Sequence, residues 1–510
     1  MGCSETAGGG GSGGMGGGGA GGAPECEGPE DCNDSNECTE DVCDSTGMCS
    51  NTPLGDGAIC GAGACTSGEC APITSVYECS EQGIRDAIAD GGGPHAFDCK
   101  GEQVVVTTDE IVINNSVILD GLDLLAVDGG SQAHRVFRVE EAATVEFRRL
   151  TVTGGNASTT DETEGGGIWN LGTLTLRNCR VSGNSVGIGS MPRGGGIFNE
   201  RGDLTLVNTS VSGNTLSFPG EGGGIFNSGQ LMMMASVVSD NTIAFGGSGA
   251  GIFNHRGGVT LMDSTVSGNG PALEQAANLF GGGIYNIGGV TLIRSTVSDN
   301  EADVGGGILI GGLVPGSLAS IDSTISGNTA ETDGGGISLG LGRADLTNTT
   351  VSENAAGRNG GGVANLGGQI RLASCTLWGN TTRGSGSAIF SFGDFASTSL
   401  RNSVVDAGCF VFGPPITSND HNIESMGDTC GFDQPTDQVN VSADDLTLGD
   451  LADNGGPTET HALGEGSVAI DQIPAVDCVD ADGEPLTTDQ RGEPRPGGAM
   501  CDVGAFEVQP

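Results

Sequence analysis

Basic residues are scarce in this chain. Lys and Arg together number 19 against 65 Asp and Glu, which gives the 510 residues a formal net charge of −46. Such a charge repels phosphate backbones and anionic lipid headgroups alike. We therefore expect no nucleic-acid partner and interpret the excess of acid as a solvated surface that keeps the protein soluble.

Aromatic residues and long apolar runs are also rare. The chain has 16 Phe, two Tyr and two Trp beside 96 Gly, and this composition does not suit the thick core of an ordinary globular domain. No apolar run reaches the ~20 residues that a membrane-spanning helix needs. A thin core lined by small and aliphatic side chains remains possible, which favours a solenoid.

Cysteine, by contrast, is concentrated in residues 26–72. This stretch holds eight of the 17 Cys and almost no apolar residue, so we expect a module held by disulfides in an oxidising compartment, either extracellular or in the cell envelope. Zinc is the less favoured alternative, because the stretch has no His and no short C-x₂-C knuckle. The eight are Cys26, Cys32, Cys38, Cys43, Cys49, Cys60, Cys65 and Cys70.

Residues 1–25 are expected to form a Gly-rich tether. The small residue Gly2 precedes Cys3 and a Gly-rich linker follows, an order that resembles the lipidated Cys of bacterial lipoproteins. The resemblance predicts a lipid on Cys3 as the chain's one membrane contact. Myristoylation of Gly2 is an alternative that conflicts with the disulfide-rich stretch, and a plain Gly-rich tail is another.

A short helix is expected over residues 80–90. Ile84 and Ile88 share one face of this segment, which predicts an amphipathic helix capping the structure that follows. Cys79 and Cys99 bracket the helix and could form a disulfide across it.

A repeat occupies most of residues 73–405. Its first half is GGGI-x-N, as at 194–199 and 222–227, and its second half is exemplified by VTLMDSTVSGN at 259–269. Successive repeats lie 24 to 32 residues apart, the length of one coil with three short strands separated by Gly and Asn turns. The sequence therefore predicts an all-β fold, a right-handed parallel β-helix in which each coil buries its apolar face against its neighbours.

Three rows of residues identify the inward face of the coils. Two rows are aliphatic in every repeat, and a third, two places before the second aliphatic row, is small. Cys179 and Cys375 stand in the small row seven coils apart, so they cannot bond each other and are interpreted as core filler. The first aliphatic row is Ile168, Ile197, Ile225, Ile252, Ile284, Ile308, Ile337, Val363 and Ile389, and the second is Val181, Val211, Val238, Val266, Val297, Ile325, Val351 and Leu377.

Asparagine recurs at the turn after the second aliphatic row. Asn tolerates the left-handed backbone conformation, and stacked amides can bond from coil to coil. We interpret this row as structural. It consists of Asn184, Asn214, Asn241, Asn269, Asn300, Asn328, Asn354 and Asn380.

An aromatic residue follows the inward Ile in five consecutive repeats. Strand alternation turns these side chains outward, where rings at coil spacing could stack on sugars or anchor a partner protein. The alternative is that they stack on one another beneath the loops that precede each Gly triplet. This candidate binding stripe consists of Trp169, Phe198, Phe226, Phe253 and Tyr285.

Histidine and clustered acids give no catalytic pattern. The five His have no metal-ligand spacing, and no group of two or three acids breaks the repeat as a β-helix enzyme would need for acid–base work or for calcium. We therefore expect no catalytic residue, no metal ligand and no cofactor. The five are His95, His134, His255, His421 and His461.

The repeats resemble a known group of surface proteins. GGGI-x-N alternating with L-T-L-x-x-S-x-V-S-G-N is similar to the β-helix repeats of bacterial proteins related to the polymorphic outer-membrane proteins of chlamydiae, over residues 100–405. The cysteine spacing of residues 38–60 resembles the cysteine-rich repeat of slime-mould and myxobacterial extracellular proteins.

Residues 406–510 resemble a narrower group, the choice-of-anchor domain. The resemblance lies in LADNGGPT (451–458), DQRG (489–492) and CDVGAFE (501–507). It implies an irregular cap over the open end of the helix, with disulfides Cys409–Cys430 and Cys478–Cys501, and structural roles for His461 and Arg491.

These expectations together favour a non-catalytic, adhesin-like protein that is monomeric and either secreted or anchored at the outer membrane. Its elongated face would contact a carbohydrate or a surface protein. A polysaccharide lyase or glycoside hydrolase on the same scaffold is one alternative, and an inert surface spacer is another.

We expect Cys3 to carry lipid in the native host. Mass spectrometry of the N-terminal peptide should show the added mass on Cys3, and Cys3→Ser should release the exported protein from the membrane fraction. An exported protein with an unmodified, freely secreted N-terminus would contradict this prediction.

Overall fold

The computed structural model describes residues 73–510, except 159–162, 188–190, 274–277, 313 and 407, and also strand backbones between 39 and 72. The chain divides into two compact units, 1–72 and 73–510. The first unit contains the antiparallel pair β1 (Thr39–Cys43) and β2 (Cys49–Pro53), and an antiparallel sheet of β3 (Ile59–Cys60), β4 (Gly63–Thr66) and β5 (Glu69–Pro72). Cys3 and the side chains of the eight clustered Cys lie outside the described residues, so those assignments stay predictions.

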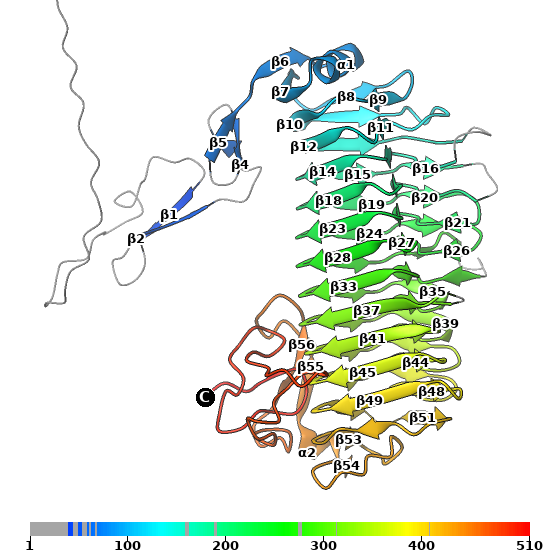
Figure 1. The fold of residues 1–510 in the computed structure, drawn as a ribbon, viewed down its shortest axis with the longest axis vertical. Helices are drawn as coiled ribbons and strands as arrows, with labels where there is room; N and C mark the ends of the chain where they lie inside the picture. The colour runs from blue at the N-terminus through cyan, green and yellow to red at the C-terminus, as the bar shows by residue number, and fades with distance from the viewer. Residues whose placement is uncertain are drawn as a thin grey trace, which may run out of the picture. The chain divides into compact units, whose positions relative to one another are not determined.

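The second unit begins with the expected helix. α1 (Glu81–Asp90) lies between β6 (Ser75–Glu78) and β7 (Gly92–Asp98) at one end of the coils (Figure 1). The Ser80 side chain caps it by accepting the Gly83 N–H at 3.2 Å. Ile84 and Ile88 are buried, as the amphipathic pattern predicts, and Cys79 forms a disulfide with Cys99. The helix therefore closes one end of the core.

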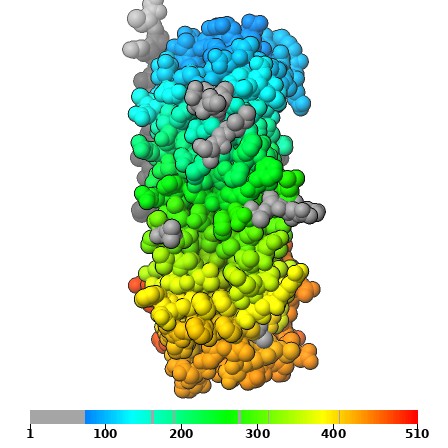
Figure 2. Space-filling model, turned by 90° about the vertical axis from the view of Figure 1, so that its right-hand side faces the viewer, coloured from blue at the N-terminus to red at the C-terminus, as the bar shows by residue number. Residues whose placement is uncertain are grey.

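The remainder is a stack of parallel coils, so the unit is a parallel β-solenoid (Figure 1). The GGGI-x-N segments form one twelve-stranded sheet, in which Ile197, Ile225 and Ile252 pair in register as predicted. Figure 2 shows the coils as successive bands of colour. The twelve strands are β9 (Ile111–Ile113), β11 (Phe137–Val139), β13 (Ile168–Asn170), β17 (Ile197–Asn199), β22 (Ile225–Asn227), β27 (Ile252–Asn254), β32 (Ile284–Asn286), β36 (Ile308–Ile310), β40 (Ile337–Leu339), β44 (Val363–Asn365), β48 (Ile389–Phe392) and β51 (Cys409–Phe412).

The L-T-L-x-x-S-x-V-S segments form a bent sheet with two strands per coil. It begins with β8 (Gln103–Val106), β10 (Val117–Asp128) and β12 (Thr144–Thr153). The first strands are β14 (Thr173–Arg177), β18 (Asp203–Val207), β23 (Gln230–Met234), β28 (Gly258–Met262), β33 (Gly289–Ile293), β37 (Gly316–Ile321), β41 (Gly342–Thr347), β45 (Gln369–Ala373) and β49 (Ser397–Arg401). The second strands are β15 (Arg180–Ser182), β19 (Ser210–Ser212), β24 (Val237–Ser239), β29 (Thr265–Ser267), β34 (Thr296–Ser298), β38 (Thr324–Ser326), β42 (Thr350–Ser352), β46 (Thr376–Trp378) and β50 (Val404–Asp406).

One residue with positive φ bends each coil between these two strands. Examples are Asn178 at 51°, Asn208 at 48° and Asn348 at 46°. Shorter strands complete the coils. They are β16 (Ser185–Val186), β20 (Thr215–Leu216), β25 (Thr242–Ile243) and β30 (Gly270–Pro271) in one sheet, and β21 (Gly220–Glu221), β26 (Gly247–Ser248), β31 (Leu279–Phe280), β35 (Glu301–Val304), β39 (Thr329–Asp333), β43 (Ala355–Ala356) and β47 (Thr381–Thr382) in another.

The core is a narrow column of aliphatic side chains. Both predicted aliphatic rows are fully buried in one continuous cluster that begins at α1. Burying an Ile, Val or Leu side chain contributes about 1.5–3 kcal/mol. The small row is buried too, and it bonds between coils: Thr209 N–H donates to Ser236 Oγ at 3.0 Å, and Ser236 N–H to Ser264 Oγ at 3.1 Å.

The Gly triplets are required by backbone proximity. Gly194, first in its triplet, has φ of 60°, and a Cβ there would lie 2.3 Å from Ile197 O. At the second position, a Cβ on Gly195 would lie 2.2 Å from Gly223 O of the next coil. At Gly194 and Gly195 a Cβ would therefore force the neighbouring backbone to move.

The Asn row forms the amide ladder expected from the sequence. Asn241 Nδ2 donates to Asn269 Oδ1 at 3.0 Å, Asn269 Nδ2 donates to Asn300 Oδ1 at 2.9 Å, and the main-chain N–H of each Asn donates to the same acceptor oxygen. A second buried ladder, which the sequence analysis did not single out, follows the outward aromatics. Its members are Asn170, Asn199, Asn227, Asn254 and Asn286.

The coils continue beyond residue 405, where the sequence analysis placed a boundary. β51, β52 (Thr417–Ser418), β53 (Ile423–Ser425) and β54 (Gln438–Val441) extend the stack, and α2 (Ala443–Leu446) follows. After β55 (Leu448–Ala452) and β56 (Thr460–Leu463), the chain returns along the flank of the lower coils (Figure 1). The C-terminal segment thus covers a side of the solenoid as well as its end, because it hydrogen-bonds to β38, β42 and β46.

Removing one rung of the first ladder should destabilise the fold. Asn269→Ala deprives two buried donors of Asn241 of their acceptor, and each unsatisfied group costs about 1–3 kcal/mol. We expect the free energy of unfolding to fall by about 2–4 kcal/mol in urea titration. Thr260→Ala, on the outward face of β28, should change it by less than about 0.5 kcal/mol. Equal stability of the two variants would show that the ladder does not support the turns.

Candidate functional site

The candidate binding stripe lies where alternation places it, on the outward side of the twelve-stranded sheet. Its rings pair in register from coil to coil. Consecutive ring centroids from Trp169 to Tyr285 are 5.9, 5.0, 5.4 and 5.1 Å apart. These distances are those of stacked and tilted aromatic pairs, so the rings pack on one another.

The stripe is nevertheless covered. Phe198, Phe226 and Phe253 are only 4, 3 and 2% exposed, while Trp169 and Tyr285 at its ends are half-buried. Of the two interpretations of the stripe, the structure supports the one in which the rings stack on one another and are covered, and it contradicts an exposed aromatic face. The physical reason is that neighbouring side chains close over the rings: guanidinium groups of Arg135, Arg138 and Arg193 lie over rings of the stripe, and the His255 ring packs beside Phe226 and Phe253.

More aromatics occur further along the same column. Phe390, which is buried, and Phe410, which is exposed, continue it, and the exposed Phe392 and Phe412 form a second outward column two residues on. The rings of Phe390 and Phe410 stack at 5.3 Å with an interplanar angle of 9°, and those of Phe392 and Phe412 at 5.1 Å with 19°. We call these four residues the phenylalanine patch.

The phenylalanine patch offers ring surface to solvent. Phe392 is 44% exposed, Phe410 40% and Phe412 60%. Phe390 follows an inward Ile as the stripe residues do, but the exposed Phe392, Phe410 and Phe412 were not predicted, although the F-x-F pattern at 390–392 and 410–412 repeats in adjacent coils. That pattern was the available signal, because residues two apart in a strand share one face.

A hollow of about 430 Å³ adjoins the patch. Phe390, Phe392 and Leu366 form its apolar side. Its polar side is Asp333, Arg358 and Asn359: Arg358 Nε donates to Asp333 Oδ1 at 3.1 Å, and Asn359 Nδ2 donates to the same oxygen at 2.8 Å. Ring surface beside planar hydrogen-bonding groups is suited to a ligand with an apolar face and hydroxyl groups at its edge.

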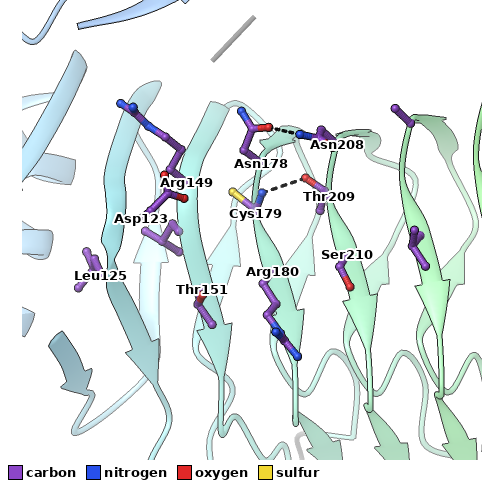
Figure 3. A pocket seen from close by; sticks show the side chains of 13 residues that line it. Asp123, Leu125, Arg149, Thr151, Asn178, Cys179, Arg180, Asn208, Thr209 and Ser210 are labelled. Atoms are coloured by element: carbon purple, nitrogen blue, oxygen red, sulfur yellow. Dashed lines mark hydrogen bonds between the residues drawn. The ribbon is translucent and has the colours of Figure 1, made fainter. Parts of the chain in front are cut away.

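A second hollow, of about 390 Å³, follows the bend of the upper coils (Figure 3). Arg149 and Asp123 lie at one end of it, and Asn178 bonds to Asn208 across neighbouring coils. Arg149 is itself buried and paired with Asp120 at 2.6 Å, where Asp120 also accepts the Leu122 N–H of a bulge. The Arg149–Asp120 ion pair therefore stabilises the backbone of this bulge.

The thiol in this second hollow is inert. Cys179 is buried, and burial raises the pKa of its thiol to about 12. Burial also raises the pKa of Cys375 to about 12. Both side chains stay protonated at neutral pH, which agrees with the interpretation of core filler.

The described residues contain no cluster of three or more His, Cys, Asp or Glu arranged to hold a metal ion. His461 Nδ1 donates to Gly449 O at 2.7 Å, and its Nε2 accepts from Ser352 Oγ at 2.7 Å, with burial lowering the pKa of the ring. Arg491 donates to Asp489 at 2.7 Å and to Glu507 O at 2.6 Å. Both residues tie the C-terminal segment together, in keeping with the structural roles that the resemblance implies.

Two further disulfides lie in the C-terminal part. Cys409 bonds Cys430 and Cys478 bonds Cys501, the pairs that the choice-of-anchor resemblance implies. Within the described part of the chain, no helix is long and apolar enough to cross a membrane.

Comparison with known proteins adds little to this geometry. No family model matches the chain, and no curated protein matches it. A solved structure, the crystal structure of pectate lyase Pel9A, aligns with a TM-score of 0.39 and 14% identity over 85% of this chain and 96% of that chain. The solenoid assignment accordingly rests on the strand register, and the resemblances to surface-protein repeats, the cysteine-rich repeat and the choice-of-anchor domain stay predictions.

The covered stripe and the exposed patch should respond differently to truncation. Phe226→Ala removes a buried ring and should lower the free energy of unfolding by about 3–5 kcal/mol. Phe412→Ala removes a largely exposed ring and should change it by less than about 1 kcal/mol. Urea titration of both variants checks this, and similar losses for the two would contradict the assignment of one ring to the core and the other to the surface.

Proposed function

We propose that this protein is a non-catalytic, secreted or cell-surface solenoid that contacts carbohydrate through the phenylalanine patch. The observation that carries the proposal is the flat, exposed ring pair of Phe392 and Phe412 beside the hollow at Arg358 and Asn359. Aromatic faces bind the apolar faces of sugar rings, and planar polar side chains bind their hydroxyls.

The charge of the chain favours a neutral glycan. A net charge of −46 repels uronates and sulfated sugars at long range. Arg358 cannot offset this repulsion, because its charge is paired with Asp333. A neutral polysaccharide has no such penalty to overcome.

An extracellular or cell-envelope location fits the same proposal. The three disulfides of residues 73–510 are of the kind that persists in oxidising compartments. In this proposal the protein acts as a monomer and reaches the membrane only through a lipid on Cys3. No cofactor is invoked.

Affinity electrophoresis in gels containing neutral or acidic polysaccharides tests the proposal. The full chain should be retarded by at least one neutral polysaccharide, and Phe392→Ser with Phe412→Ser should weaken the retardation at least tenfold, since stacking supplies about 0.5–1.5 kcal/mol per ring beyond the area buried. Phe218→Ser with Phe245→Ser is the matched control. These two rings are also exposed and paired, with centroids 6.4 Å apart, but lie outside the patch.

Three results would contradict the proposal. They are no retardation by any polysaccharide, equal retardation of the patch variant, and an equal effect of the control variant. Depolymerisation of the retarding polysaccharide during incubation would instead support the lyase or hydrolase alternative and overturn the non-catalytic part.

A further inference from the structure

The second strands of four consecutive coils carry an outward column of threonines. Thr265, Thr296, Thr324 and Thr350 occupy equivalent positions in the adjacent strands β29, β34, β38 and β42. Two positions before each Thr is the corner residue, which is Asp263, Arg294, Asp322 and Asn348 in turn. The four coils therefore present one column of hydroxyls beside one column of corner side chains.

The C-terminal segment occupies the lower two of these four positions. Gln490 is fully buried there, with its amide spanning two coils. Its Nε2 donates to Thr324 Oγ1 at 2.8 Å, and its Oε1 accepts from Thr350 Oγ1 at 2.7 Å. The two threonine hydroxyls thus bind the two ends of one primary amide, and Thr458 Oγ1 and Glu459 O of the C-terminal segment accept from the same Nε2 at 2.9 and 3.1 Å.

The corner residue fixes the main chain of the same segment. Asn348 Nδ2 donates to Asp322 Oδ1 at 3.0 Å and to Thr488 O at 3.0 Å. Two adjacent coils therefore bind both the Gln490 side chain and the nearby carbonyl of Thr488.

The upper two positions repeat this arrangement without an occupant from residues 73–510. Thr265 and Thr296 are half-buried, and no described residue hydrogen-bonds their hydroxyls. At the corner, Arg294 Nε and Nη2 donate to Asp263 at 2.7 and 2.8 Å. The Nη1 donors of Arg294 can bind a main-chain carbonyl, just as Nδ2 of Asn348 donates to Thr488 O.

We propose that Thr265 and Thr296 form a binding site for a glutamine or asparagine side chain presented by a turn of a partner polypeptide. The amide nitrogen donates to Thr265 Oγ1 and the amide oxygen accepts from Thr296 Oγ1, as Gln490 does with Thr324 and Thr350 one step along the column. Arg294 donates to a main-chain carbonyl of the same turn. This site is separate from the phenylalanine patch and does not depend on it.

A polypeptide is the occupant that the contacts favour. The site is continuous with an interface where the same side chains already bind a polypeptide turn, since Thr296 and Thr324 are neighbours in one sheet. Parallel, in-register strands reproduce the spacing of the two hydroxyls from coil to coil, at about 4.8 Å. The upper pair of threonines therefore presents two hydroxyls at the spacing that binds the Gln490 amide at the lower pair.

The chain's own turn supplies the probe. Residues 487–495 form a hairpin whose ends meet, with Arg495 N–H donating to Thr487 O at 2.9 Å. The probe is a head-to-tail cyclic peptide of these nine residues with a fluorophore on the side opposite Gln490, and cyclisation joins the two ends that meet in the structure. Its anisotropy is measured with the full chain at up to millimolar concentration.

We expect saturable binding of the cyclic peptide to the full chain. Thr265→Val with Thr296→Val should weaken it at least tenfold, as should Gln490→Ala in the peptide. Thr215→Val with Thr242→Val is the matched control, because these threonines also face each other from adjacent strands, 3.1 Å apart, on a different sheet. Thermal melting confirms that each protein variant is folded.

The proposal is overturned if the peptide does not bind the unaltered chain. It is also overturned if Thr265→Val with Thr296→Val in the protein, or Gln490→Ala in the peptide, leaves the affinity unchanged. It is also overturned if the control variant loses binding equally. Binding that survives Thr265→Val with Thr296→Val would mean that the peptide replaces the chain's own turn at Thr324 and Thr350.

Discussion

Hydrogen bonding at the buried turns is the constraint on which the rest of this structure depends. Each coil must bend around a core only a few side chains wide, and its turn amides cannot reach water. The asparagine ladder solves this by letting one side-chain oxygen accept both the main-chain N–H and the amide N–H of the coil before it, as Asn300 does for Asn269. Because each Asn of the ladder donates to the Asn of the next coil, the coils stack in register.

Strict register divides the side chains into two sets with different freedom. The inward columns of Ile, Val, Ser, Thr and Asn are held constant, since each residue contacts its own equivalent above and below. Outward side chains do not have to match their equivalents in the neighbouring coils. The stripe column holds Phe in three coils, Ser338 and Ala364 later, and exposed Phe410 at its end. Contact surfaces are therefore built by varying outward columns on a fixed frame.

The sequence alone predicted the frame well because one chain supplies many copies of its own coil. Constancy at Ile197, Val211 and Asn214 across repeats identifies the inward face without any structure. Periodicity does not reveal what covers an outward residue, so the sequence left open whether Phe226 is exposed or buried, and only the structure shows its burial beneath Arg193. The docking of Gln490 was not predictable from the sequence either, because Gln490 lies in a segment without repeats, 140 and 166 residues from its partners Thr350 and Thr324.

Hydrogen–deuterium exchange of the full chain tests the central claim most directly. If the ladder supports the fold, the main-chain amides of Asn214, Asn241, Asn269 and Asn300 exchange as slowly as the aliphatic strand positions, although they lie at turns. Exchange of these four amides at the rate of exposed loops, while the strands stay protected, would contradict the account.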